Sequence, residues 1–106
     1  MTHVYSDTFF DYIDAGARRS AQGVLNLIGP WLRPTSVLDL GSGRGVWLDE
    51  WHKAGAAEVL GVDGHYVDRS QLALPQDSFL AADLTAPVDT GRRFDLAQSL
   101  EVGEHL

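Results

Sequence analysis

Acidic residues stand at the ends of the apolar segments of this 106-residue chain, and the first of them is followed by alternating glycines. Asp39 precedes Gly41, Gly43 and Gly45 in the segment Val-Leu-Asp-Leu-Gly-Ser-Gly-Arg-Gly, which begins at Val37. This run predicts a buried strand, a tight loop in which glycines take left-handed dihedrals, and then a helix. Without a Cβ, such a loop lets a ligand approach the backbone closely. The pattern is typical of a nucleotide-binding corner.

The other acids predict contacts with the same ligand. Asp63 ends the apolar segment 58–63, Asp83 ends the segment 79–83, and Glu101 follows the segment 94–100. Parallel strands end at one edge of a sheet, where open α/β folds bind ligands, so we expect these carboxylates and Asp39 to gather there. An acid placed like Asp63 accepts hydrogen bonds from two ribose hydroxyls. Alternatively, Asp63 caps the turn after its strand.

Glycine spacing and charge discriminate between ligands. A dinucleotide fingerprint requires a glycine at position 46, which is Val46 here, so a nicotinamide-dependent oxidoreductase is disfavoured. The charge of Asp39 would repel a pyrophosphate and suit a cationic ligand. At these residues the chain resembles the class I S-adenosylmethionine-dependent methyltransferases, whose first motif is an acid followed by alternating glycines. S-adenosylmethionine carries a sulfonium and an ammonium group and has no phosphate. A glycine-rich turn without a ligand is the simpler alternative.

The resemblance implies S-adenosyl-L-methionine as the cofactor and assigns roles to individual residues. It implies that Asp63 binds the ribose and that Asp83 accepts from the adenine amino group. The amide of Leu84 would donate to a ring nitrogen. The cofactor-binding set implied in this way is Asp39, Gly41, Ser42, Gly43, Gly45, Asp63, Gly64, Asp83, Leu84, Ser99 and Glu101.

The reaction implied is transfer of the sulfonium methyl group to a nucleophile by in-line displacement. The acceptor is expected to be a small molecule, which the sequence does not identify. If it is a hydroxyl, His105 is the candidate general base, although a solvated histidine is an equal alternative. The alternative function is a non-catalytic S-adenosylmethionine-binding module, or a remnant that has lost transfer activity, with the same cofactor residues.

The C-terminal end contains a possible metal-binding motif, although we do not expect a metal there. Glu101, Glu104 and His105 form Glu-x-x-Glu-His. This motif resembles the end of the fourth strand in RNA-terminal 2'-O-methyltransferases and some quinone-pathway O-methyltransferases, where two carboxylates and a histidine hold a divalent ion. On a helical turn the three positions share one face. Methyltransferases without a metal carry similar residues, so the expected site contains none.

The hydrophobic pattern predicts the elements that position these residues. A short helix is expected over 6–14 and a longer one over 17–28 after a join loosened by Gly16, with Trp31 and Leu32 packing as a final turn. Strands are expected at 36–40, 58–63, 79–83 and 94–100, with helices at 46–54 and, more briefly, 68–74. The predicted fold is α/β: a Rossmann-like, doubly wound parallel sheet of order 3-2-1-4 with N-terminal helices. We expect a helical cap over 1–34 and a cofactor-binding half domain over 35–106.

Composition narrows the functional classes. A net charge of -7 argues against unaided binding to nucleic acid or anionic membranes. The absence of cysteine excludes disulfides and thiolate metal sites and suits a cytoplasmic location. The first residues show neither the basic nor the apolar region typical of a signal peptide, and no apolar run approaches the roughly 20 residues of a membrane span.

The resemblance also bears on what the chain does alone. Class I methyltransferases are built on a seven-stranded sheet, of which the first four strands are expected here and the C-terminal strands are missing. The fourth strand would then be an edge with unpaired backbone groups. We expect the 106-residue chain to bind cofactor weakly, to lack transfer activity, and to self-associate through this strand or by exchanging N-terminal helices.

Overall fold

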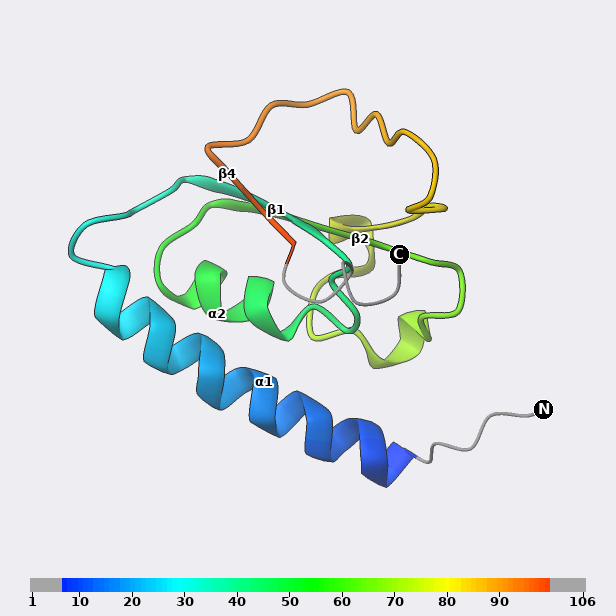
Figure 1. Ribbon diagram of the computed structural model, residues 1–106, viewed down its shortest axis with the longest axis horizontal. Helices are drawn as coiled ribbons and strands as arrows, with labels where there is room; N and C mark the ends of the chain where they lie inside the picture. The colour runs from blue at the N-terminus through cyan, green and yellow to red at the C-terminus, as the bar shows by residue number, and fades with distance from the viewer. Residues whose placement is uncertain (1–6, 100–106) are drawn as a thin grey trace.

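A four-stranded parallel sheet lies above two α-helices in the computed structural model, which describes residues 7–99 (Figure 1). Along the chain the elements are α1 (Asp7–Ile28), β1 (Ser36–Leu40), α2 (Val46–Lys53), β2 (Glu58–Asp63), the 3-10 turns η1 (Arg69–Gln71) and η2 (Gln76–Ser78), β3 (Phe79–Ala81) and β4 (Leu96–Gln98). The strand order is β3-β2-β1-β4. This confirms the predicted α/β class and strand order.

Register between the strands places Asp39 of β1 opposite Gly61 of β2 and Gln98 of β4. β1 and β2 have the predicted bounds, whereas β3 and β4 are shorter than predicted. Side-chain hydrogen bonds explain the shorter β4: the Asp95 carboxylate accepts from the Thr35 amide at 2.8 Å. The Asp95 amide in turn donates to the Ser36 hydroxyl at 2.8 Å, so side chains, not a backbone ladder, fix the chain before Leu96.

The N-terminal region forms one continuous helix, so the prediction of two helices is wrong. Gly16 lies inside α1, where a glycine costs only about 1 kcal/mol relative to alanine. Packing outweighs this cost, because Ala21 and Leu25 of α1 are buried. Arg18 also pairs with Asp49 of α2 at 2.8 Å.

The turn after α1 differs from the prediction in its packing. The amides of Trp31 and Leu32 donate to the Ile28 carbonyl oxygen at 2.8 and 2.9 Å, so a final turn does form. However, Trp31 is 88% exposed and does not pack onto the protein. Leu25 and Ile28 already occupy the space between this end of α1 and the core.

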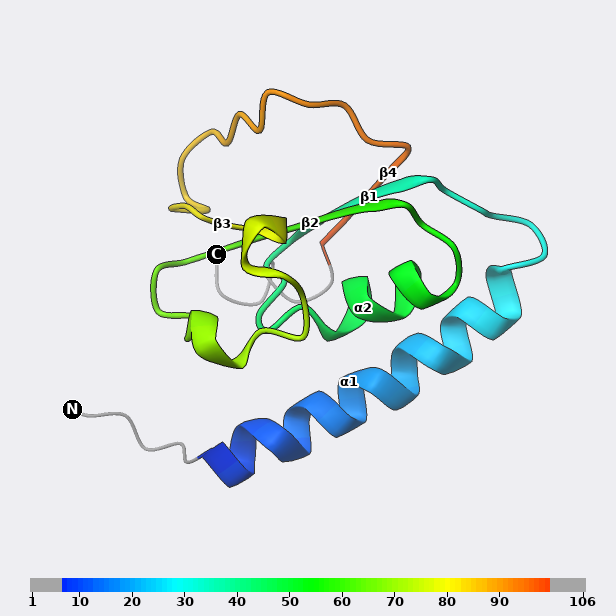
Figure 2. The same cartoon turned by 180° about the vertical axis from the view of Figure 1, so that it is seen from behind.

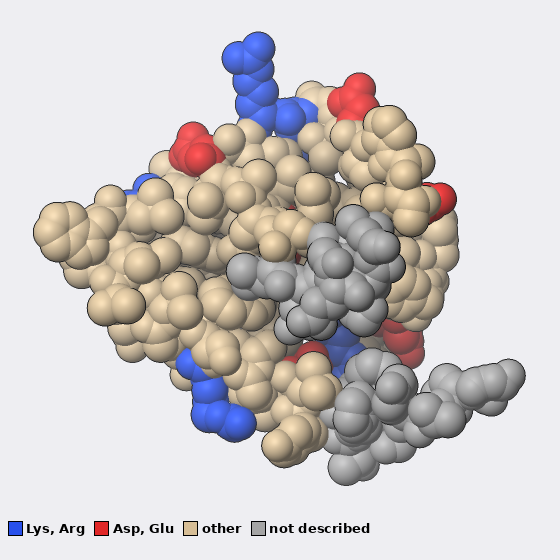
Figure 3. Space-filling model, in the orientation of Figure 1, with Lys and Arg blue, Asp and Glu red and all other residues tan. Residues whose placement is uncertain are grey.

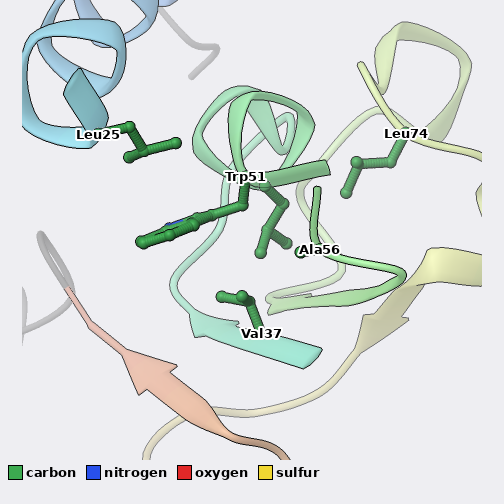
Figure 4. Packing of buried hydrophobic residues seen from close by; sticks show 6 residues of the cluster. Leu25, Val37, Trp51, Ala56 and Leu74 are labelled. Atoms are coloured by element: carbon green, nitrogen blue, oxygen red, sulfur yellow. The ribbon is translucent and has the colours of Figure 1, made fainter. Parts of the chain in front are cut away.

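The core lies between the helices and one face of the sheet. Its buried cluster is Leu25, Val37, Leu48, Trp51, Ala56 and Leu74. The ring of Trp51 extends between Leu25 of α1 and Val37 of β1 (Figure 4). Fully burying a valine or leucine side chain of this cluster stabilises the fold by about 1.5 to 3 kcal/mol. This packing holds α2 against β1 and β2 and thereby fixes the loop that joins β1 to α2.

The opposite face of the sheet is crossed by the segment 82–95 (Figure 2). In the described part of the chain both α-helices lie on the other side, whereas a doubly wound sheet would carry helices on both faces. None of the helices within 7–99 combines the length and the apolar character that crossing a membrane requires. Charged side chains are spread over the face in Figure 3 and are not gathered into one patch.

Candidate functional site

The loop 41–45 joins β1 to α2 and turns at three glycines. Gly41, Gly43 and Gly45 have φ angles of 83°, 57° and 85°, which confirms the predicted left-handed conformations. The amides of Gly41 and Ser42 donate to the Val62 carbonyl oxygen at 2.7 and 3.2 Å. These bonds anchor the loop to β2. A Cβ at Gly43 would meet no atom within 4 Å, so the space beside this residue is open.

The Asp63 carboxylate ties the loop to the end of β2. It is buried, with 4% of its surface exposed, and Oδ2 accepts from the Gly43 amide at 2.8 Å. Oδ1 accepts from the Gly64 amide at 2.8 Å and from the hydroxyl of Tyr66. Asp63 therefore caps the following turn and also faces the glycine loop, so both predicted roles remain compatible with its position.

A small cleft lies between the glycine loop and α1. Its volume is about 100 Å³. It is lined by Asp39, Gly41, Ser42, Gly43, Arg44, Val46 and Trp47, and by Ile13, Asp14 and Ala17 of α1. Asp39 is 3% exposed, and Arg44 pairs with Asp14 at 3.2 Å. Asp14 is thus paired with a cation of the same cleft, so Asp39 is the lining carboxylate whose charge suits a positively charged ligand.

Gly61 explains how the loop can approach β2. A Cβ at this position would lie 2.5 Å from the Ser42 hydroxyl oxygen and 3.2 Å from a methyl group of Leu48. Gly61 was not identified from the sequence, although a glycine inside an apolar strand signals such a close approach. Asp14 and Arg44 were not identified either, because their contact joins segments distant from one another. The bond from Tyr66 to Asp63 follows no periodic pattern and was not foreseen.

Asp83 is placed differently from the prediction. β3 ends at Ala81, so Asp83 does not end the strand. Its exposed carboxylate accepts from the hydroxyl and the amide of Thr85 at 2.6 and 2.9 Å, and these bonds lower the pKa of Asp83. The local bonds draw the chain into a turn and end the strand early. The Ala82 amide still donates to the Asp63 carbonyl oxygen at 2.8 Å, so the turn begins at the predicted edge.

Apart from Asp83, the predicted site residues divide into three groups. The structure brings together Asp39, Gly41, Ser42, Gly43, Gly45, Asp63 and Gly64 around the loop. Leu84 and Ser99 instead line a hollow of about 590 Å³ with Leu38 and Leu40. Glu101, Glu104 and His105 lie outside the described residues. Within 7–99 no three His, Asp or Glu side chains converge as metal ligands would.

Comparisons of this chain with protein-family models, with curated proteins and with solved structures found no match. Inference about function therefore starts from the residues of the corner between β1 and β2 and from their geometry.

Proposed function

We propose that this chain binds S-adenosyl-L-methionine at the loop 41–45 and belongs to a methyltransferase acting on a small-molecule acceptor. The observation that carries the proposal is the pair of buried carboxylates, Asp39 and Asp63, on either side of a loop turned by three glycines. The strand order β3-β2-β1-β4 supports a Rossmann-like classification of the sheet. Ligands of such sheets bind beyond the carboxyl ends of the strands, which is where this loop begins.

The residues present fit the chemical groups of this cofactor. Asp63 offers two carboxylate oxygens, which match the two hydroxyls of a ribose. The open space beside Gly43 lets a ligand lie along the backbone, where a side chain would block it. The Asp39 carboxylate, which lines the cleft beside the loop, suits the ammonium group of the methionine part.

The catalytic contribution of these residues is binding and orientation. When bound, the cofactor would supply an electrophilic methyl group. A nucleophile would attack the methyl carbon as its bond to sulfur breaks. Holding two reactants in line can lower a barrier by about 7 to 11 kcal/mol. The loop and the two carboxylates would hold one of these two reactants, the cofactor, in position. His105, the candidate base for a hydroxyl acceptor, lies outside the described residues.

Calorimetric titration with S-adenosylhomocysteine, S-adenosylmethionine and NAD tests the proposal. We expect the first two to bind and NAD not to bind. Asp63→Ala should weaken binding by about 1.5 to 3 kcal/mol, the range for hydrogen bonds to a charged group. Asp77→Ala is the matched control, because it removes an exposed carboxylate from η2. Binding of NAD in preference to S-adenosylhomocysteine would refute the proposal.

Methyl transfer separates an enzyme from a non-catalytic binding module. Both would use the same cofactor residues, so calorimetry does not distinguish them. Incubation with methyl-labelled S-adenosylmethionine and pooled small-molecule acceptors should give a labelled product if the protein is a transferase. Binding without any labelled product from the chain or from a longer form of it would favour the binding module.

Self-association through β4 stays a prediction. In the sheet formed by residues 7–99, β4 pairs with β1 and forms one edge. Backbone groups on such an edge can pair with a second chain. Sedimentation at several protein concentrations should therefore show dimers or larger species, and a monomer at every concentration would contradict this expectation.

A further inference from the structure

The hydroxyl of Tyr66 bonds to the buried carboxylate that the proposed function assigns to the ribose. Oδ1 of Asp63 accepts from this hydroxyl and also from the Gly64 amide. Oδ2 accepts from the Gly43 amide. Each carboxylate oxygen has about two acceptor positions, so both positions of Oδ1 are occupied and Oδ2 has one remaining. A ligand with two adjacent hydroxyls needs one position on each oxygen.

The ring of Tyr66 is held mainly by this bond and not by the core. Tyr66 is 80% exposed. Its ring crosses Gly64 so closely that a Cβ there would lie 2.3 Å from a ring carbon. Gly64 has no side chain that would exclude the ring, and a mostly solvated ring loses little when it moves away. The tyrosine can therefore leave Asp63 without disturbing the fold.

We propose that Tyr66 is a built-in competitor for ligand hydroxyls: its phenol occupies Oδ1 of Asp63 and must withdraw before a vicinal diol binds. The inference rests on the proposed function, since it concerns the ribose end of the same site. It makes Tyr66 a residue that determines specificity. A ligand gains affinity from Asp63 only if its hydroxyls replace the phenol as donors to the carboxylate. A ligand without the diol therefore gains no affinity when the tyrosine is displaced.

The ionisation of the phenol agrees with this arrangement. Partial desolvation of the phenol, then the bond to Asp63 and the charge of that carboxylate, raise the pKa of Tyr66 to about 12. A phenol released into solvent has a pKa near 10. Saturation with a diol ligand should therefore lower the pKa of Tyr66, because the hydroxyl no longer faces the carboxylate.

Tyr66→Phe removes the competing hydroxyl and keeps the ring. We expect the variant to bind S-adenosylhomocysteine about tenfold more tightly, because a contact of this strength leaves only a minor fraction of the free protein ready to bind. Adenosine binding, followed by NMR, should strengthen similarly, whereas binding of 2',3'-dideoxyadenosine should not change. Tyr12→Phe is the control, because Tyr12 is an exposed tyrosine on α1.

Ultraviolet titration of the ligand-free protein tests the contact without any ligand. The difference between wild type and Tyr66→Phe isolates one phenol, whose midpoint should lie well above pH 10. In Gly64→Ala the added methyl group should push the ring off Asp63 and return the midpoint toward 10. A midpoint near 10 in the wild type would overturn the proposal, whatever binds at the site.

The ligand measurements separate this inference from the proposed function. If the wild type binds S-adenosylhomocysteine and Tyr66→Phe binds it equally or less tightly, the competitor role is wrong and the proposed function stands. Equal strengthening of adenosine and its dideoxy analogue would also overturn it, because hydroxyls would then play no part. If neither protein binds S-adenosylhomocysteine, both proposals fail.

Discussion

The carboxyl edge of the sheet has two differently built parts: the corner between β1 and β2, and the end of β3. Asp63, at the corner, is 4% exposed, and its donors come from the glycine loop and from the turn that follows β2. Asp83, beyond β3, is exposed and bonds to Thr85, two residues along the chain. One carboxylate joins separate segments, and the other satisfies its own turn.

The packing beneath each strand explains this difference. β2 has six residues and α2 packs against it, so its end is fixed and its side chains can meet the loop from β1. β3 has three residues, and a turn follows it. A carboxylate without fixed neighbours bonds to the nearest backbone amide. In the proposed site the Asp63 carboxylate is therefore already held in place by backbone amides, and a ribose would displace the Tyr66 phenol from it. Asp83 would itself have to leave Thr85 to reach an adenine.

The largest difference between the two parts should appear in stability. Leu48 of α2 is fully buried beneath the corner, whereas Leu80 of β3 is 37% exposed. Leu48→Ala should lower the free energy of unfolding by about 2 to 5 kcal/mol. Leu80→Ala should lower it by about 1 kcal/mol or less. Denaturant unfolding measures both, and equal losses would show that the end of β3 is as firmly packed as the corner.

Ligand affinity should separate the two acids. Asp83→Ala should weaken S-adenosylhomocysteine binding by about 0.5 to 1.5 kcal/mol, which is less than the loss expected for Asp63→Ala. The reason is that a ligand bond to Asp83 replaces its bonds to Thr85, so the net gain is smaller. Calorimetry on both variants gives the ranking. A larger loss at Asp83 would reverse the comparison.

Two glycine substitutions test the fit of the loop against β2. Gly61→Ala places a methyl group 2.5 Å from the Ser42 hydroxyl oxygen, so it should destabilise the protein by about 1 to 3 kcal/mol. Gly23→Ala is the control, because a Cβ there would meet nothing within 4 Å on the exposed side of α1. It should stabilise by about 0.5 to 1 kcal/mol. A neutral Gly61→Ala would show that the loop yields easily.

The smallest effect concerns the ion pair between α1 and the loop. Asp14→Asn removes a carboxylate that pairs with Arg44 at 3.2 Å, and should cost about 0.5 to 1 kcal/mol because both groups keep some exposure to solvent. Added salt should reduce this cost through screening. Thermal unfolding at low and high salt measures it. A cost that does not depend on salt would indicate packing and not charge.

Much of the corner could be predicted from the sequence because local patterns encode it. Mostly apolar runs indicated β1 and β2, and alternating glycines indicated the left-handed loop. The end of β3 could not be predicted in the same way, because it depends on whether the Asp83 side chain bonds locally. The helix break expected at Gly16 failed for a similar reason, since packing on α2 outweighs a small local preference.

Two further kinds of contact could not be predicted from the sequence: contacts between distant segments and contacts within irregular loops. Arg44 and Asp14 lie 30 residues apart, and nothing periodic connects them. The bond from Tyr66 to Asp63 spans three residues in a loop with no regular pattern. Such contacts require the arrangement of α1, the loop and β2 to be known first.

An NMR titration of the isotope-labelled chain with S-adenosylhomocysteine tests the central claim most directly, because it shows where a ligand binds. We predict the largest amide shifts at Gly41, Gly43, Asp63 and Gly64, around the corner of β1 and β2. Shifts confined to Leu84 and the hollow beside it, on the opposite face of the sheet, or no shifts at any ligand concentration, would contradict the account.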